Sequence, residues 1–143
     1  GLAGMRLGYC IGHAELIRAF DKIRNHFGVT KLGQVAGIAA LADQDHLRSV
    51  VTKVSAAREH ISAIARTNGL TPLPSATNFV TIDCGRDGEY ARRVLDALVK
   101  AGVFVRMPGV APLNRCIRVT AGTSDDVAIF AEELPRALKA ASA

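Results

Sequence analysis

Hydrophobic positions in the first half of the chain recur with the period of α-helices. A helix is expected from His13, with one apolar face, and a second is expected over 31–42, where Ala and Gly indicate close packing against another element. A third, longer helix is expected after the suitable N-caps Asp43 and Asp45, ending at Asn68-Gly69. The apolar face of the first helix comprises Leu16, Ile17, Phe20 and Ile23.

Other segments show the patterns of strands. Residues 5–12 are largely apolar and bounded by glycine, which predicts a strand buried on both faces. The second half predicts strands at 78–84, 103–106 and 116–121, with a helix at 89–101 after the first of them. Ser124 is the expected cap of a final helix, which Pro135 should kink or end.

This order of elements predicts an α/β fold class. Over 45–143 the order is helix, strand, helix, strand, strand, helix, which is a small α+β domain with helices on one side of a sheet. The long helix exceeds the usual length and is expected to bridge two structural units. We therefore divide the chain into 1–44 and 45–143.

Composition narrows the classes of function. The chain of 143 residues is 49% hydrophobic and 22% charged, the balance of a globular protein. Its net charge of +5 makes anionic partners plausible, but the basic residues are scattered and the aromatics are only five Phe and two Tyr. No nucleic-acid partner is expected, because such partners favour a basic patch with interleaved aromatics.

Cysteine and histidine positions do not indicate a metal or disulfide framework. Cys10, Cys84 and Cys116 are far apart in apolar stretches and are expected to be free buried thiols. The four histidines have no metal-ligand spacing. No stretch has the length of a membrane span, so no membrane partner and a cytoplasmic location are expected.

The first nine residues, G-L-A-G-M-R-L-G-Y, carry the most informative chemistry. Glycines flank Arg6 at the start of the predicted strand, and glycines let backbone approach a ligand while a guanidinium binds phosphate with two hydrogen bonds. From these residues alone the pattern is compatible with an anion site but does not identify one. The alternative is an arginine that extends from a strand end to solvent.

These nine residues resemble the segment that follows the Schiff-base lysine in pyridoxal-phosphate (PLP) aminotransferases of class I/II, fold type I, especially those similar to histidinol-phosphate aminotransferase. The resemblance implies that Arg6 binds the phosphate of PLP. It also implies that the Schiff-base lysine would precede Gly1, so that no catalytic lysine lies in this chain and the chain alone is expected to be inactive.

The resemblance continues in order along the chain, in segments listed here: 27–30 with 34–41, 74–79, 102–106 and 117–123. It implies a C-terminal portion of such an enzyme. Residues 1–44 would then be a remnant of the PLP-binding large domain, with its last strand and helices, and 45–143 the C-terminal small domain. The implied partners are amino-acid and 2-oxo-acid substrates and a second copy of the enzyme in a homodimer.

Two further arginines are candidate substrate ligands. Arg118 stands mid-strand between Ile117 and Val119, where a buried guanidinium is costly unless it meets a carboxylate. The resemblance implies that Arg118 binds the α-carboxylate of the substrate and that Arg106 helps to bind a side-chain phosphate. The alternatives are a structural ion pair for Arg118 and a solvated side chain for Arg106.

Three other functions stay open from the sequence. A threonine-phosphate-decarboxylase-like PLP lyase resembles the aminotransferases across these segments, and release of carbon dioxide would identify it. A non-catalytic amino-acid-binding regulatory domain would bind its ligand without PLP. A nucleic-acid-binding domain would show steep salt dependence.

Overall fold

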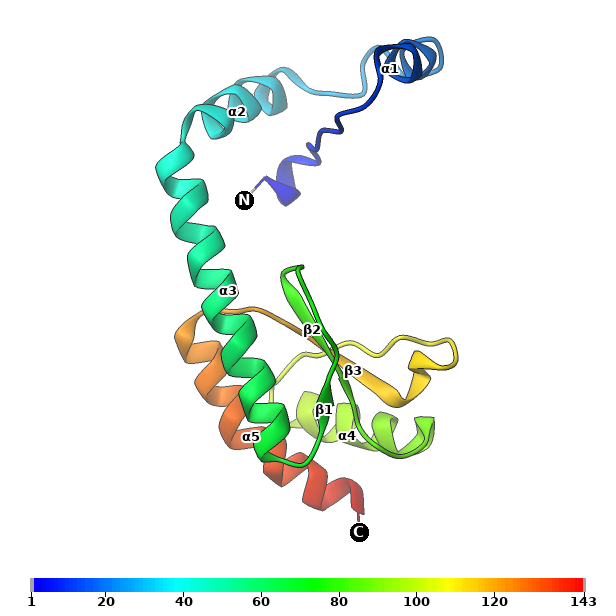
Figure 1. Cartoon of the computed structure of the whole chain (residues 1–143), viewed down its shortest axis with the longest axis vertical. Helices are drawn as coiled ribbons and strands as arrows, with labels where there is room; N and C mark the ends of the chain where they lie inside the picture. Colours follow the sequence, from blue (N-terminus) through cyan, green and yellow to red (C-terminus); the bar gives the residue numbers. More distant parts are fainter. Residues whose placement is uncertain (1, 143) are drawn as a thin grey trace. The chain divides into compact units, whose positions relative to one another are not determined.

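The computed structural model describes residues 2–142 and divides into two compact units, Gly1–Arg48 and Ser49–Ala143 (Figure 1). Gly1 and Ala143, the outer ends of the two predicted domains, lie outside the described residues. The division falls within the first turns of α3 (Gln44–Thr67), near the predicted boundary. The assignment of 1–44 to a large PLP-binding domain stays a prediction.

The first unit contains short helices joined by irregular segments. They are the 3-10 helix η1 (Ala3–Met5) and the α-helices α1 (Ala14–Asp21) and α2 (Lys31–Ala42). The Thr30 hydroxyl accepts a hydrogen bond from the Gly33 N–H at 3.0 Å, which caps the start of α2. The predicted helices near 13 and over 31–42 are confirmed.

The predicted strand at 5–12 is wrong. Met5 ends η1, and no strand is assigned over 6–12. A strand exists only when its backbone pairs with a neighbouring strand, and the first unit holds no other strand among its described residues. Leu7 instead packs on α2, where a Cβ added to Gly37 would meet the Leu7 Cδ2 at 2.5 Å. The close packing expected at the small residues of this helix is confirmed there.

The long helix α3 begins and ends close to its predicted signals. The Asp43 carboxylate accepts the His46 N–H at 3.0 Å and caps the helix, whereas Asp45 lies inside it. At the other end Gly69 has a φ of +74°, a left-handed conformation that suits glycine. The Leu70 N–H then donates to the Ala65 carbonyl at 3.0 Å and closes the last turn.

The second unit is built on a small antiparallel sheet in the order β1-β2-β3, in front of α4 in Figure 1. Its strands are β1 (Thr71–Pro72), β2 (Phe79–Asp83) and β3 (Cys116–Thr120). The strands at 78–84 and 116–121 are confirmed, and β1 was not predicted. The predicted strand at 103–106 is reduced to one bridge between Arg106 and Arg118, because 103–105 make no ladder with β3.

One face of this sheet packs on helices. Alternate residues of β2 and β3 point to α3, α4 (Gly88–Lys100) and α5 (Ser124–Ser142) and form the core with them. The largest fully buried side chains are Ile61, Val80, Ile82, Val94, Leu98, Cys116, Ile117 and Leu134. Helices on one side of a small sheet are the arrangement that the sequence predicted.

Two details at the last helix differ from expectation. Thr123, not Ser124, caps the start of α5. The Thr123 N–H and the Thr123 hydroxyl both donate to the Asp126 carboxylate, and the Asp126 N–H donates to the Thr123 hydroxyl. Pro135 does not end α5, which continues to Ser142, and the predicted alternative of a kink stays a prediction. The proline removes one backbone donor, but packing of Leu134 and Ala137 in the core holds the turn.

Candidate functional site

The sheet of the second unit has a second face, opposite the helices, that carries two of the predicted site residues. In the register of β2 and β3, Thr81 stands opposite Arg118 and Phe79 opposite Thr120. Arg106 forms the bridge on the other side of Arg118. Directly opposed residues in antiparallel pairing share one face. We call the surface made by Phe79, Thr81, Arg106, Arg118 and Thr120 the arginine face.

Arg118 is half-buried and stacks on an aromatic ring. Its guanidinium carbon lies over the Phe79 ring, 4.7 Å from the ring centroid. The ion pairs found among residues 2–142 do not include Arg118, so the structural ion pair considered from sequence has no counterpart there. A cation stacked on an aromatic ring still has N–H groups able to meet an anion.

Arg106 is exposed and is held beside Arg118 by backbone hydrogen bonds. The Arg118 N–H donates to the Arg106 carbonyl at 2.6 Å, and the Arg106 N–H donates to the Arg118 carbonyl at 3.1 Å. Like charges directly opposite one another destabilise a sheet unless an anion lies between or above them. The structure thus brings together the two arginines that the sequence proposed as substrate ligands.

Arg6 belongs to the first unit and is described by itself. It is an exposed non-glycine residue with φ 54° and ψ 36°, in the left-handed region. Its Nη1 donates to the Ala3 carbonyl at 3.2 Å, and no ion pair of Arg6 is found among the described residues. Added Cβ atoms at Gly4 and Gly8 would meet nothing within 4 Å. Only one N–H of the guanidinium is used in the hydrogen bond to Ala3, and a guanidinium with further donors between two open glycines suits a phosphate group.

Polar groups at the end of β2 are tied to one another rather than to a ligand. Burial raises the pKa of Asp83, but hydrogen bonds from the Gly85 N–H and the Arg115 guanidinium outweigh it and leave the pKa below its ordinary value. The Arg115 Nη2 lies 2.5 Å from the Asp83 carboxylate. Because the Arg115 guanidinium is already paired with the Asp83 carboxylate, Arg115 is not a candidate ligand for the substrate.

The cysteines are free thiols, as expected, but only two of them are buried. Burial raises the pKa of the Cys84 thiol to about 11 and also raises the pKa of Cys116. Cys10 is exposed, because the predicted buried strand that would have covered it does not form. No group of three or more His, Cys, Asp or Glu converges as a metal site within residues 2–142. Across the same residues, no helix is both long and apolar enough to cross a membrane.

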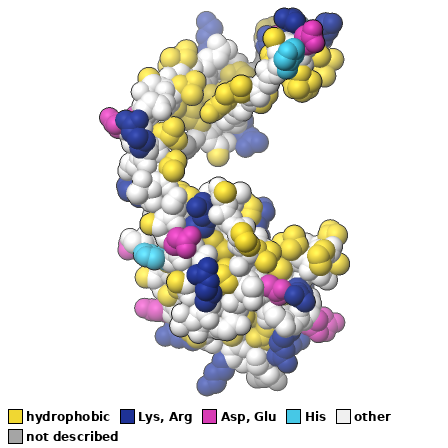
Figure 2. All heavy atoms as spheres, viewed as in Figure 1, with side chains coloured by type: hydrophobic (Ala, Val, Ile, Leu, Met, Phe, Trp, Pro, Cys, Tyr) yellow, Lys and Arg dark blue, Asp and Glu magenta, His cyan; other side chains and the backbone are white. Residues whose placement is uncertain are grey.

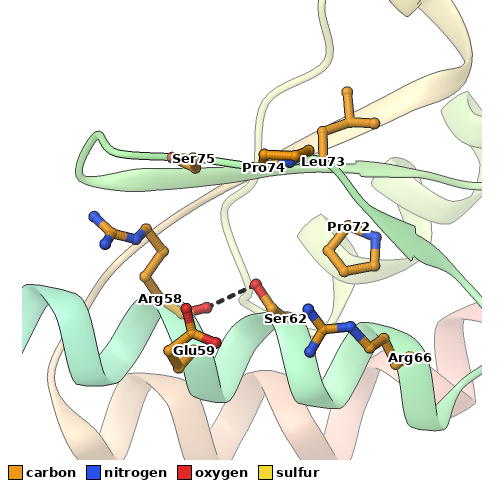
Figure 3. Close-up of a pocket in the computed structure, with 8 residues that line it drawn as sticks. All are labelled: Arg58, Glu59, Ser62, Arg66, Pro72, Leu73, Pro74 and Ser75. Carbon is orange, nitrogen blue, oxygen red and sulfur yellow. Dashed lines mark hydrogen bonds between the residues drawn. The ribbon is translucent and has the colours of Figure 1, made fainter.

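A cavity of about 220 Å³ lies between α3 and the edge strand, and sequence reasoning did not find it (Figure 3). Arg58, Ser62 and Arg66 line it from successive turns of α3, and the segment 72–75 lines the other side. The spacing of four residues could have indicated the row on the helix. Nothing in the sequence indicated which strand would face that row.

Its polar groups are largely satisfied within the fold. The Ser62 hydroxyl donates to the Arg58 carbonyl at 2.9 Å, and the Arg58 Nη1 donates to the Thr77 carbonyl at 2.9 Å. The Ser75 hydroxyl donates to the Phe79 carbonyl at 2.5 Å. Glu59 and Arg66 also line the cavity.

Comparison with known proteins gives consistent matches. Residues 1–134 match the family described as "Aminotransferase class I and II". The chain is 38% identical over 138 residues to "Histidinol-phosphate aminotransferase 2" of Methylococcus capsulatus, covering 96% of this chain and 36% of that protein. More than half of that protein's length has no counterpart here.

Two solved structures extend the comparison. Histidinol-phosphate aminotransferase from Sinorhizobium meliloti, solved in complex with pyridoxal-5'-phosphate, superposes with a TM-score of 0.91 at 51% identity. That match covers 97% of this chain and 38% of the other. A decarboxylase from Sulfurospirillum multivorans superposes with a TM-score of 0.69 at 22% identity, which shows a shared fold and no more.

Proposed function

Because the chain belongs to the aminotransferase class I and II family, we propose that it forms part of a PLP-dependent enzyme that transfers an amino group from an amino acid to a 2-oxo acid. The observation that carries this proposal is the Arg118 guanidinium on the arginine face, opposite Arg106, which stacks on Phe79 and is in no ion pair found among residues 2–142. The chain spans little more than a third of its relatives, so activity belongs to the whole protein.

Arg118 would bind the α-carboxylate of the amino acid. Its planar guanidinium can donate two parallel hydrogen bonds to a carboxylate, which fixes the direction of the substrate as well as its position. Fixing the carboxylate orients the Cα–H bond that must break, and orientation of this kind supplies a large share of catalysis. No carboxylate of residues 2–142 is in an ion pair with Arg118 to compete for this role.

Arg106 would bind a second anionic group of the substrate. A phosphate on the side chain of the amino donor would offset the repulsion between the two opposed arginines. The names of the relatives from Methylococcus capsulatus and Sinorhizobium meliloti support histidinol phosphate or a related compound as the donor that carries the phosphate. Histidinol phosphate has no carboxylate, so the carboxylate bound by Arg118 would belong to the amino acid on the other side of the exchange, such as glutamate. Both arginines then contribute to donor selection.

The first unit would contribute to cofactor binding through Arg6. Its exposed guanidinium, which spends one donor on the Ala3 carbonyl, and the open glycines on either side fit the phosphate of PLP. PLP, when bound, supplies an electron sink that stabilises negative charge at the substrate Cα. We propose that the Schiff-base lysine is not among the lysines of this chain and that residues 1–143 alone are inactive.

Exposed apolar side chains of the first unit support a larger assembly. Ile11 is 91% exposed, Phe27 92% and Ile23 83%, and Figure 2 shows hydrophobic side chains gathered on the visible side of this unit. Contiguous apolar surface of this kind marks interaction sites. We propose that the rest of the protein and the second subunit of a homodimer cover it. A cytoplasmic location stays a prediction.

The experiment is a product assay on the whole protein with PLP, histidinol phosphate and 2-oxoglutarate. Transamination gives glutamate from 2-oxoglutarate and releases no carbon dioxide. Histidinol phosphate has no carboxyl group to lose, so the lyase is tested in parallel with threonine phosphate, from which it would release carbon dioxide without forming glutamate. A regulatory amino-acid-binding domain would bind the donor without PLP and form neither product. Either of these last two results would overturn the proposal.

A further inference from the structure

We propose that Phe79 is a positioning residue that holds the Arg118 guanidinium in place for the substrate carboxylate. The inference rests on the proposed function for the identity of the ligand, but the contact itself stands independently of it. The Arg118 guanidinium carbon lies 4.7 Å from the Phe79 ring centroid. A cation over the face of an aromatic ring is attracted by the negative charge of that face.

The register of the sheet explains how these two side chains meet. Arg118 pairs with Thr81 and Phe79 pairs with Thr120, so Phe79 and Arg118 are diagonal neighbours on the arginine face. Diagonal neighbours across antiparallel strands are within reach of aromatic and long side chains. The ring therefore receives the guanidinium without any distortion of the strand.

The direction of this contact separates the two arginines. Strand β3 lies between β2, which carries Phe79, and the bridge at Arg106. A guanidinium drawn over Phe79 therefore extends toward β2 and away from the like charge of Arg106. Without the ring, Arg118 would have several rotamers open to it, and ordering them on binding would weaken the affinity for a carboxylate.

The backbone of Phe79 is anchored by the preceding turn. Its carbonyl accepts a hydrogen bond from the Ser75 hydroxyl at 2.5 Å, and its N–H donates to the Thr77 hydroxyl at 3.4 Å. On the next strand position, the Ala121 N–H donates to the Asn78 carbonyl at 2.8 Å. A ring on a fixed backbone can act as a platform for a flexible side chain.

Phe79 is not explained by core packing. It is half-buried, and it belongs neither to the core of the second unit nor to the partly buried residues that pack against that core. Its even-numbered neighbours Val80 and Ile82 provide the core side of β2. The aromatic side chain on the opposite face therefore has a role in the arginine face.

The contact is tested first in the chain itself by NMR of the arginine Nε–Hε groups. A guanidinium over a ring is shielded, so the Arg118 signal should lie upfield and should move to an ordinary shift in Phe79→Leu. It should stay upfield in Phe79→Tyr, which keeps the ring. An Arg118 signal that does not move in Phe79→Leu would overturn the proposal.

The consequence for binding is tested kinetically in the whole protein. Phe79→Leu should raise KM for glutamate as amino donor about threefold to tenfold, the range expected from loss of a partly exposed cation–π contact. The value of kcat should change little, because the contact helps ground state and transition state alike. Phe79→Tyr should retain the KM of the unsubstituted protein.

A matched control separates positioning from stability. Phe130→Leu makes the same exchange in the core, where the side chain is 2% exposed, and should lower the melting temperature without changing KM. An unchanged KM in Phe79→Leu, or a Tyr variant as impaired as the Leu variant, would contradict the positioning role. If the unsubstituted protein does not transaminate, the proposed function is wrong. The NMR experiment then still tests whether Arg118 stacks on Phe79.

Discussion

Replacing Arg118 by alanine is the substitution whose effects the structure separates most clearly. Hydrogen bonds to a charged partner contribute about 1.5–3 kcal/mol, so loss of the arginine that binds the carboxylate should lower kcat/KM for glutamate as amino donor by roughly 10-fold to 150-fold. Arg118→Lys keeps the charge but not the paired donors, and it should fall between alanine and arginine.

The same substitution should leave stability almost unchanged. Loss of the contact with Phe79 costs about 0.5–1 kcal/mol. Removal of a charge opposite Arg106 raises the free energy of unfolding by about 0.2–1 kcal/mol, because the repulsion between the two arginines is lost. These opposite contributions are similar in size, and no ion pair of Arg118 is found among residues 2–142 to add a further loss.

The assay pairs steady-state transamination by the whole protein with urea unfolding of the same variants. PLP binding serves as the control, because Arg118 is assigned to substrate and should not alter the affinity for the cofactor. A variant that keeps its kcat/KM but loses 2 kcal/mol or more of unfolding free energy, of the order expected for a broken buried pair, would show a structural arginine and refute the reasoning.

Three other substitutions or probes follow from the structure. Arg6→Ala in the whole protein should weaken PLP binding roughly 10-fold to 100-fold, because a charged phosphate contact is lost. Fluorescence titration measures this affinity, and an unchanged value would show that Arg6 does not bind the cofactor. Asp83→Asn should lower the unfolding free energy at pH 7 by about 1 kcal/mol or less. Because a lowered pKa stabilises the folded chain only while the carboxylate is charged, urea titrations should show the difference between the two proteins shrinking below about pH 4. In the folded chain of 143 residues, a thiol reagent at pH 8 should modify the exposed Cys10 rapidly and Cys84 slowly, since burial raises the pKa of Cys84 to about 11. Equal rates of modification would contradict the packing at the end of β2.

The helices could be predicted from sequence because their signals are local. The cap at Asp43, the glycine at Gly69 and the apolar period of α4 are all contained in the segments that they define. The strand at 5–12 and the strand at 103–106 could not be judged in this way. Each depends on pairing with a distant neighbour, and an apolar run does not identify its partner.

The candidate site was predictable only in part for the same reason. Arg118 stood out because a charged residue inside an apolar strand needs an explanation. Its contact with Phe79 depends on the register between β2 and β3, which lie more than thirty residues apart in the chain. The roles of Arg6, Arg106 and Arg118 in ligand binding stay predictions.

The most direct test of the proposed function follows the amino group itself. The whole protein, loaded with PLP, is given histidinol phosphate labelled with ¹⁵N at its amino group, together with unlabelled 2-oxoglutarate. We expect the label in glutamate. Label that stays on the donor would contradict the assignment of this chain to an amino-transferring enzyme.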